Sequence, residues 1–265
     1  MEIAQLLATN FAIVCAFFLA CWGINVVIKD PSFVDSLWAL GMVVVAVSTY
    51  FMTGARGPHA TVLTVLCAIW GLRLGLYLLW RWRKNGPDRR YVTMMGKAQS
   101  ERGWGFAKAS LILVFALQAP LQFIVCLPIQ LGQVAQTTQL GQLATAGMSL
   151  AIIGIFFETV GDWQLARFKG NPANEGKILD TGLWRYTRHP NYFGDACVWW
   201  GLFLIAAETG PIGIASLPGP ILITLLLTKW SGVPTTEGRM RRKRPEYMDY
   251  VARTSGFIPM LPKKL

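Results

Sequence analysis

Long apolar segments recur along the whole chain and are separated by short polar stretches. Seven of them approach the length of about 20 residues that a helix needs to cross the hydrocarbon core of a bilayer. They cover about residues 3–28, 33–52, 60–82, 106–127, 140–163, 192–207 and 211–230. Each is too long for a strand, and a bilayer admits only helices or closed barrels as spanning structures. The pattern therefore predicts an all-α, polytopic membrane protein with seven transmembrane helices, in which residues 1–265 form a single membrane-embedded domain.

Two of the predicted spans carry polar side chains at helical spacing. The two stripes consist of Arg73, Tyr77 and Arg81 in the third span and of Glu158, Asp162 and Lys169 in the fifth. Residues four, seven or eight positions apart lie on the same face of a helix. Ionisable groups are costly inside a membrane and mark functional sites. The sequence predicts that these stripes either pair with one another or hold a ligand that carries both donors and anionic groups.

Asp35 lies near the start of the second predicted span, on the same helix face as Trp38 and Met42. Two interpretations remain open at this point. Asp35 is a catalytic acid beside an apolar wall, or it is an N-cap close to the membrane surface.

The segment from Thr181 to Asp195 has the densest group of chemically capable side chains in the chain. Pro190 disfavours a helical conformation at His189, so we expect a helix to begin at Asn191. The N-terminus of such a helix, with Arg185 and Arg188 beside it, is suited to binding a phosphate group. The alternative is a solvated basic loop at the membrane surface.

Composition and charge determine the expected orientation. Hydrophobic residues make up 53% of the chain, and the formal net charge is +11. If the seven spans are right, all but two of the 25 Lys and Arg residues (Arg56 and Arg73) fall on one side of the membrane. The positive-inside rule then places the N-terminus outside and the C-terminus in the cytoplasm, as in a multi-pass protein of the inner (cytoplasmic) cell membrane. The basic run at 239–244 also fits an anionic-lipid patch.

Several classes of function are disfavoured. Nucleic-acid binding is not expected, because the basic loops border membrane spans and form no separate domain. No dinucleotide-binding glycine motif or P-loop is present. The five cysteines all lie in predicted spans, so we interpret them as small buried hydrophobic residues and predict neither a metal site nor a disulfide. No obligate protein partner is evident from the sequence.

Several segments together resemble the steroid 5α-reductase family, in a bacterial branch classed as a domain of unknown function. The similarity is strongest over about 158–262. It includes the run GLWRYTRHPNYFGD, Lys177 ahead of Thr181, Ser231-Gly232-Val233-Pro234, and the tail from Arg244-Pro245-Glu246-Tyr247 to Pro259. A weaker similarity covers Val34-Asp35 and the stretch from Trp70 to Tyr77.

This resemblance implies a seven-helix fold that holds NADPH in a polar cavity open to the cytoplasm. It also implies reduction of the carbon–carbon double bond of a 3-oxo-Δ4 steroid, or a similar lipophilic enone that enters from the bilayer. Cofactor-binding roles carry over to Asp162, Lys169, Asn191 and Asp195, and by position on the third-span stripe to Arg73, Tyr77 and Arg81. Further cofactor-binding candidates in the matching segments are Lys177, Tyr186, Arg188, His189 and Arg241. Asp35, in its neutral form, is the candidate catalytic donor to the substrate carbonyl.

The sequence departs from the animal steroid enzymes at two positions. A tyrosine is expected three residues before the arginine of the third span, where this chain has Trp70, and a glutamate is expected on the second span, where it has Asp35. The run Arg188-His189-Pro190 with Tyr192 also resembles isoprenylcysteine methyltransferases. An S-adenosylmethionine-dependent membrane methyltransferase is therefore the alternative function, although Glu237 is followed by Gly238 rather than by the second glutamate usual in that family. A transporter is disfavoured because the two halves of the chain show no repeat.

Overall fold

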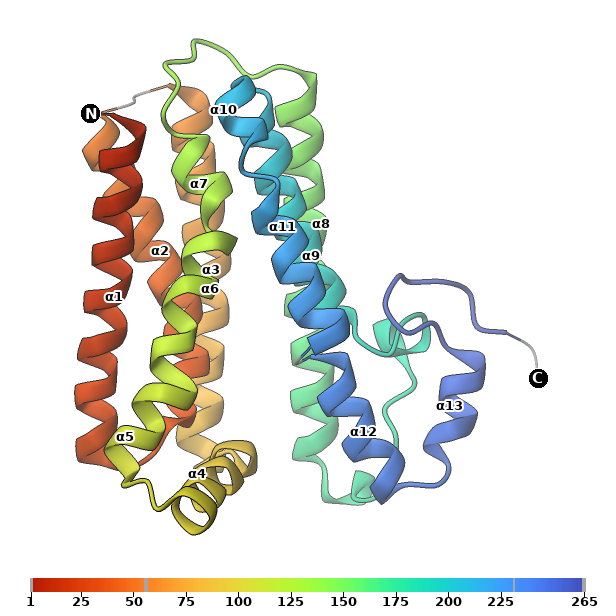
Figure 1. Cartoon of the computed structure of the whole chain (residues 1–265). Coiled ribbons are helices and arrows are strands. Elements are labelled where there is room, and N and C mark those ends of the chain that lie inside the picture. The colour runs from red at the N-terminus through yellow and green to blue at the C-terminus, as the bar shows by residue number, and fades with distance from the viewer. Residues whose placement is uncertain (1, 55–56, 231, 264–265) are drawn as a thin grey trace.

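The computed structural model describes residues 2–54, 57–230 and 232–263, so the predicted outer charge Arg56 and the matched residue Ser231 lie outside the described residues. Long helices run side by side along one axis (Figure 1). In chain order the elements are α1 (Ile3–Ile28), η1 (Pro31–Phe33), α2 (Val34–Thr53), α3 (Pro58–Asn85), α4 (Arg89–Arg102), α5 (Phe106–Ser110), η2 (Leu111–Phe115), α6 (Ala116–Val125), α7 (Leu127–Leu131), α8 (Gln142–Gly170), η3 (Pro172–Asn174), η4 (Gly182–Arg185), α9 (Pro190–Ala207), α10 (Pro211–Ile214), α11 (Pro218–Leu225), η5 (Leu226–Trp230), α12 (Val233–Lys243) and α13 (Tyr247–Arg253). The described residues contain no named strand, and the all-α prediction is confirmed.

Among the described residues, six helical segments are long and apolar enough to cross a membrane. They are Ile3–Ile28, Pro31–Thr53, Pro58–Asn85, Phe106–Val125, Gln142–Gly170 and Pro211–Arg242. The prediction of a multi-pass helical membrane protein is confirmed. The sixth predicted span forms α9, which is helical as expected but is not one of these six. The physical reason is that its first two turns carry the polar residues Asn191 and Asp195, which lower its mean hydropathy.

Helix boundaries follow from local chemistry. Proline occupies the first positions of α3, α9, α10 and α11, where its missing N–H costs nothing and its fixed φ suits the first helical turn. Because Pro190 is itself the first helical residue, α9 begins one residue before the expected start. Gly54 and Gly103 end α2 and α4 in the left-handed conformation that glycine adopts without steric cost.

The bundle has two parts, which are close together in the half that contains the N-terminus and separate toward the end that carries α4 and α12 (Figure 1). In Figure 1, α1 to α7 lie on one side and α8 to α13 on the other. The closest helix pairs are α8 with α9 and α2 with α3, and α9 also contacts α3, α7 and α11. The N-terminus lies at one end of the bundle, whereas the basic helices α4 and α12 lie at the other (Figure 1).

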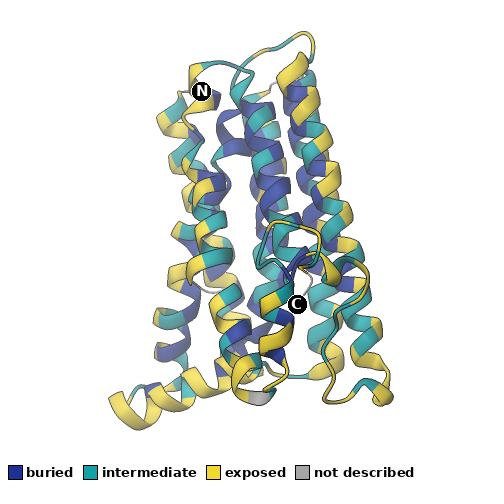
Figure 2. Cartoon of the chain, turned by 90° about the vertical axis from the view of Figure 1, so that its right-hand side faces the viewer, coloured by how far each residue is buried: buried dark blue, intermediate teal, exposed yellow. Residues whose placement is uncertain are grey.

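The buried residues line the inside of the bundle, and the end that carries α4 is largely exposed (Figure 2). Trp70 of α3 and Trp199 of α9 are almost fully buried and meet edge to face, with ring centroids 5.4 Å apart. This aromatic pair joins the two parts of the bundle next to the polar stripes.

All five cysteines are free thiols, and four of them are buried as predicted. The prediction was wrong for Cys15, which is exposed on the outer surface of α1. Helix α1 packs on the bundle with only one face, so its opposite face remains uncovered.

Candidate functional site

Glycines bring α8 and α9 into backbone contact. Gly147 and Gly154 recur at a spacing of seven residues on α8, and they face Gly201 and Gly194 of the antiparallel helix α9. A Cβ atom on Gly147 would lie 2.6 Å from the backbone oxygen of Gly201. Small residues permit this close approach, which is typical of helix pairs in membranes. The contact places the polar stripe of α8 directly against the first turns of α9.

Arg73 of α3 is the central cation of the site. Its Nη2 lies 2.6 Å from Oε2 of Glu158, and its Nη1 donates a hydrogen bond of 2.8 Å to Oδ2 of Asp162. The indole N–H of Trp70 donates to the same Glu158 oxygen at 2.8 Å. Glu158 and Asp162 are almost fully buried. The sequence left open whether the two stripes pair with one another, and the structure shows that they do.

The first two turns of α9 add an amide and a third carboxyl group. Asn191 donates through Nδ2 to Oδ1 of Asp162 at 3.2 Å, and the hydroxyl of Tyr77 donates to the backbone carbonyl of Asp162 at 3.5 Å. Asp195 is placed differently, because its Oδ1 is buried and accepts no hydrogen bond from any residue that the structure describes. The indole N–H of Trp199 lies near this carboxyl group but also has no partner among those residues. A buried acceptor without a donor is costly, so this atom is suited to receiving an N–H or O–H group from a ligand.

Acidic groups outnumber cations in this cluster. A single guanidinium, that of Arg73, lies among the three carboxyl groups of Glu158, Asp162 and Asp195. Such an excess inside a membrane requires bound protons or a ligand that supplies donors or positive charge. We refer to Arg73, Glu158, Asp162, Asn191 and Asp195 as the acid cluster.

Four cations gather at the basic end of the bundle, below the acid cluster. Lys169 at the end of α8 is within electrostatic range of Arg81, Arg239 and Arg244, and the Arg81 guanidinium lies 6.0 Å from the centre of the Tyr77 ring. These residues come from α3, α8 and the segment around α12, so they span both parts of the bundle. Like charges within this range repel one another. Asp162 offsets part of the charge of Arg81 and Asp88 part of that of Arg239, and a bound anion would offset more. We refer to Arg81, Lys169, Arg239 and Arg244 as the cation group.

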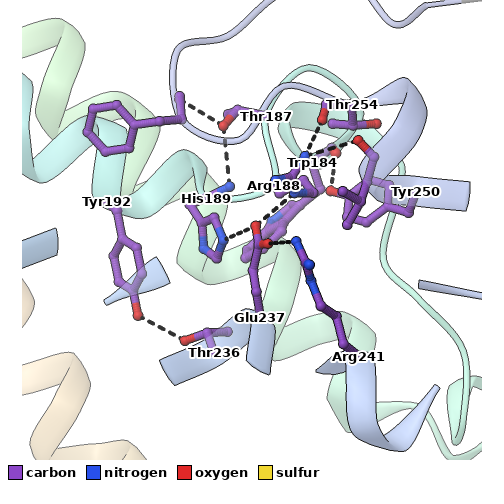
Figure 3. A network of polar contacts seen from close by, with 12 residues as sticks. Trp184, Thr187, Arg188, His189, Tyr192, Thr236, Glu237, Arg241, Tyr250 and Thr254 are labelled. Atoms are coloured by element: carbon purple, nitrogen blue, oxygen red, sulfur yellow. Dashed lines mark hydrogen bonds and ion pairs between the residues drawn. The ribbon is translucent and has the colours of Figure 1, made fainter. Parts of the chain in front are cut away.

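Three predicted cofactor ligands instead converge on one carboxylate, as Figure 3 shows. Glu237 of α12 accepts from Nε of Arg188 at 2.8 Å, from Nε2 of His189 at 3.2 Å and from Nη2 of Arg241 at 3.2 Å. The ring of His189 also stacks on that of Tyr192, with centroids 5.2 Å apart. These contacts fasten α12 to the start of α9. The roles of Arg188, His189 and Arg241 in cofactor binding remain predictions.

The C-terminal segment is tied to the same loop. Thr187 donates through its hydroxyl to the carbonyl of Phe257 at 2.8 Å, and Arg188 donates to the carbonyl groups of Val251 and Thr254 (Figure 3). The hydroxyl of Tyr250 donates to the carbonyl of Trp184. Burial raises the pKa of Tyr250, so this hydroxyl remains a donor at neutral pH.

Lys177 and Tyr186 have exposed side chains and lie outside the acid cluster. Their backbone carbonyl groups take part in the structure, since that of Lys177 accepts from Arg244 and that of Tyr186 accepts from the N–H of Met260. The structure therefore shows only main-chain contacts for these two candidates.

Residues of α4 bind both carboxylate oxygens of Asp35. Its Oδ1 accepts from the hydroxyl of Tyr91 at 2.6 Å, and its Oδ2 pairs with Nη2 of Arg90 at 2.8 Å. Burial, followed by the nearby charge of Asp35, raises the pKa of Tyr91 well above its ordinary value, so Tyr91 donates and Asp35 accepts. In this pairing Asp35 acts as an acceptor, whereas the predicted catalytic role requires it to donate.

Sequence reasoning missed three features of this region. Glu158 was placed on its stripe but was not assigned to the site, although it is the partner of both Arg73 and Trp70. Glu237 was not assigned a structural role, and α4 was expected only as part of a basic loop. The signal for α4 was present, because Asp88 caps the helix and Tyr91, Met95 and Ala98 follow at helical spacing.

Comparisons with known proteins identify the family of this chain. The model of the family described as "Protein of unknown function (DUF1295)" matches residues 21–254. The chain belongs to the DUF1295 family. This family is broadly related to the steroid 5α-reductases, which agrees with the resemblance found in the sequence.

An uncharacterized protein of Schizosaccharomyces pombe is 22% identical over 274 residues, which cover 91% of this chain and 76% of the yeast protein. No solved structure matches. The comparisons thus support the family and a membrane protein but name no activity.

Proposed function

We propose that this protein is an integral-membrane reductase that uses NADPH to reduce a carbon–carbon double bond conjugated to a carbonyl group in a lipophilic substrate. A 3-oxo-Δ4 steroid is the substrate class that the resemblance suggests. The observation that carries the proposal is Oδ1 of Asp195, a buried acceptor without a donor beside the amide of Asn191. The two side chains lie one helical turn apart, so they suit one polar planar group such as a carboxamide.

The residues present fit such a cofactor. Asn191 and Asp195 would bind the nicotinamide carboxamide, and the cation group would bind the phosphate groups. NADPH, when bound, supplies a hydride. Arg73 holds Asp162 in place, and Asp162 in turn accepts from Asn191 and fixes the orientation of its amide. The Trp70–Trp199 contact and its buried surroundings exclude water from one side of the acid cluster.

Asp35 is the proposed hydrogen-bond donor to the substrate carbonyl group. Asp35 would donate to the substrate carbonyl only after its ion pair with Arg90 opens, because the paired carboxylate acts as an acceptor. In this proposal α4 therefore controls whether Asp35 can donate to the substrate.

We further propose seven spans, with the N-terminus outside and the C-terminus in the cytoplasm of a cell with an inner (cytoplasmic) membrane. Helix α8 ends near the basic end of the bundle and α10 begins at the opposite end, so α9 carries the chain back along the bundle (Figure 1). Eleven of the residues of α9 are buried against other helices, which permits a less apolar helix at membrane depth.

The methyltransferase alternative has one supporting observation, which is the excess of acids around Arg73. Negative charge of this kind also suits the sulfonium cation of S-adenosylmethionine. The cation group favours the reductase, because S-adenosylmethionine carries no phosphate for these residues to bind.

Thermal stabilisation of the detergent-solubilised protein tests the proposal. A ligand at 100 times its Kd stabilises a protein by about 2.7 kcal/mol. We expect NADPH to raise the Tm, NADH to do so only at much higher concentration because it lacks the 2′-phosphate, and S-adenosylmethionine to have no effect. Arg239→Gln should weaken NADPH binding about tenfold, since it removes one charge-assisted contact.

The matched control is Arg83→Gln, because Arg83 is an exposed cation at the same end of α3 that is not part of the cation group. Its NADPH affinity should equal that of the wild type. Equal stabilisation by NADH and NADPH, or stabilisation by S-adenosylmethionine alone, would contradict the proposal.

A further inference from the structure

A lipid-facing stripe runs along the outer side of α8. Ile152, Phe156 and Trp163 recur at intervals of four and seven residues, and each is more than half exposed in the isolated chain. In a membrane protein, exposed apolar side chains of a spanning helix contact lipid. Arg167 continues the same stripe four residues after Trp163, at the basic end of the bundle.

The stripe ends at an open hollow of about 320 Å³. Trp163 and Arg167 line one side of it, and the following loop lines the other with Asn171, Asn174 and Thr181. The side chain of Gln164 holds the loop in place, because its Oε1 accepts from the backbone N–H of Leu183 at 3.0 Å. Polar amide and hydroxyl groups thus surround the hollow beyond the end of the apolar stripe.

Gly182 allows the loop to close over Gln164. Its φ of +63° lies in the left-handed region, and a Cβ atom there would lie 2.3 Å from Nε2 of Gln164. Asn171 fixes the other edge, because its Oδ1 accepts from the N–H of Ala173 at 3.0 Å. The rim of the hollow is therefore built by specific contacts.

Arg167 has no anionic partner in the part of the chain that the structure describes. Its guanidinium lies 5.5 Å from the centre of the Trp163 ring, and no salt bridge to it occurs among residues 2–54, 57–230 and 232–263. Tryptophan is enriched at the headgroup level of a bilayer. A cation stacked on such a ring, next to lipid, is therefore available to a phosphate group.

We propose that this hollow is a binding site for the headgroup of an anionic glycerophospholipid. Arg167 binds the phosphate, the side chains of Asn171 and Thr181 bind headgroup hydroxyl groups, and an acyl chain lies along Ile152, Phe156 and Trp163. The continuity between the apolar stripe and the polar hollow favours a lipid over a soluble anion, because a soluble anion makes no use of the stripe. The site is separate from the acid cluster and does not depend on the proposed reaction.

Native mass spectrometry of the full-length protein, released from detergent, tests this site. The protein is titrated with phosphatidylglycerol and with phosphatidylcholine of the same acyl chains. We expect the wild type to bind phosphatidylglycerol at least about tenfold more tightly than phosphatidylcholine, and Arg167→Gln to lose that preference, since it removes the charge-assisted contact to the phosphate.

Lys84→Gln is the matched control. Lys84 also lies over a half-exposed tryptophan at the same end of the bundle, 5.2 Å from the centre of the Trp80 ring, but it does not line the hollow. Its phosphatidylglycerol affinity should stay within about twofold of the wild type. An unchanged melting temperature of Arg167→Gln would show that the loss is not a folding defect.

Competition distinguishes the source of the anion. Inorganic phosphate or NADPH at equal concentration should leave bound phosphatidylglycerol in place. Displacement by inorganic phosphate would identify a free-anion site, and displacement by NADPH would assign the hollow to the nucleotide. The proposal would be overturned by displacement with either compound or by equal binding of the two lipids. It would also be overturned if Lys84→Gln lost as much phosphatidylglycerol affinity as Arg167→Gln.

Discussion

The backbone of Gly154 in α8 touches that of Gly194 in α9. A Cβ atom on either residue would lie 2.5 Å from the backbone oxygen of the other. Four residues beyond Gly154, Glu158 lies against the same glycine, since a Cβ on Gly194 would also lie 2.7 Å from the Glu158 nitrogen. The glycine contact therefore sets the distance at which the carboxyl groups of α8 face Asn191 and Asp195.

We expect Gly154→Ala to destabilise the protein by about 1–3 kcal/mol, because the added methyl group must push α8 and α9 apart. Reversible unfolding in mixed micelles measures this change. Gly170→Ala is the control on the same helix, since nothing lies within 4 Å of a Cβ there. An equal loss in both variants would show that helix contact is not the cause.

Arg73 pairs with two buried carboxyl groups, so its removal should be costly. We expect Arg73→Leu to lose about 3–5 kcal/mol of unfolding free energy, because it leaves Glu158 and Asp162 without their cation. The triple variant that adds Glu158→Gln and Asp162→Asn should lose less than Arg73→Leu alone, since it removes the uncompensated charge. A triple variant less stable than the single one would assign the effect to packing instead.

The acid cluster should favour the oxidised form of a nicotinamide cofactor, which rests on the proposed function. The nicotinamide ring of NADP⁺ carries a positive charge, whereas that of NADPH is neutral. Asp195→Asn removes one carboxylate and should weaken NADP⁺ binding about tenfold more than NADPH binding. Isothermal titration with each nucleotide measures the ratio.

Glu101→Gln is the control for this ratio, because Glu101 is exposed on α4. An equal loss for both nucleotides in Asp195→Asn would leave carboxamide binding intact but refute the charge effect. Absence of binding by either nucleotide to the wild type would refute the proposed function itself.

Glu208 should make the fold sensitive to acid. It accepts from the N–H groups of Gly141 and Ala144 at 2.7 and 2.9 Å and from Nε2 of His59 at 2.8 Å. Burial alone would raise the pKa of Glu208, but these hydrogen bonds outweigh it and lower the pKa from its ordinary value of 4.5. The stabilisation is therefore present above pH 4.5 and is lost as the pH falls below it through the folded-state pKa.

Melting temperatures between about pH 3 and pH 7 check this expectation. Glu208→Gln should remove part of the slope below pH 4.5 and should cost about 1 kcal/mol at neutral pH, because it weakens the cap of α8. A variant with the slope of the wild type would show that another group titrates there.

The hydrophobic pattern by itself determined the helical class, the positions of six of the spans and the two polar stripes. These features depend on local sequence, because a span requires a continuous apolar length and a stripe requires only helical spacing. The boundaries of α1, Ile3–Ile28, agree with the pattern residue for residue. The pairing of Arg73 with Glu158 and Asp162 was one of two alternatives that the sequence left open. Only the opposite charges of the two stripes suggested it.

The tertiary structure decided the partners. Glu237 received Arg188 and His189, and Asp35 received Arg90, although neither contact follows from spacing. These pairs join residues that lie about 50 positions apart, so they depend on how the helices pack rather than on local pattern. Sequence also placed Asn191 and Asp195 on one face of a helix. Asn191 donates to Asp162, whereas Oδ1 of Asp195 has no donor among the described residues. Both results depend on the glycine contact, because it fixes the distance between α8 and α9.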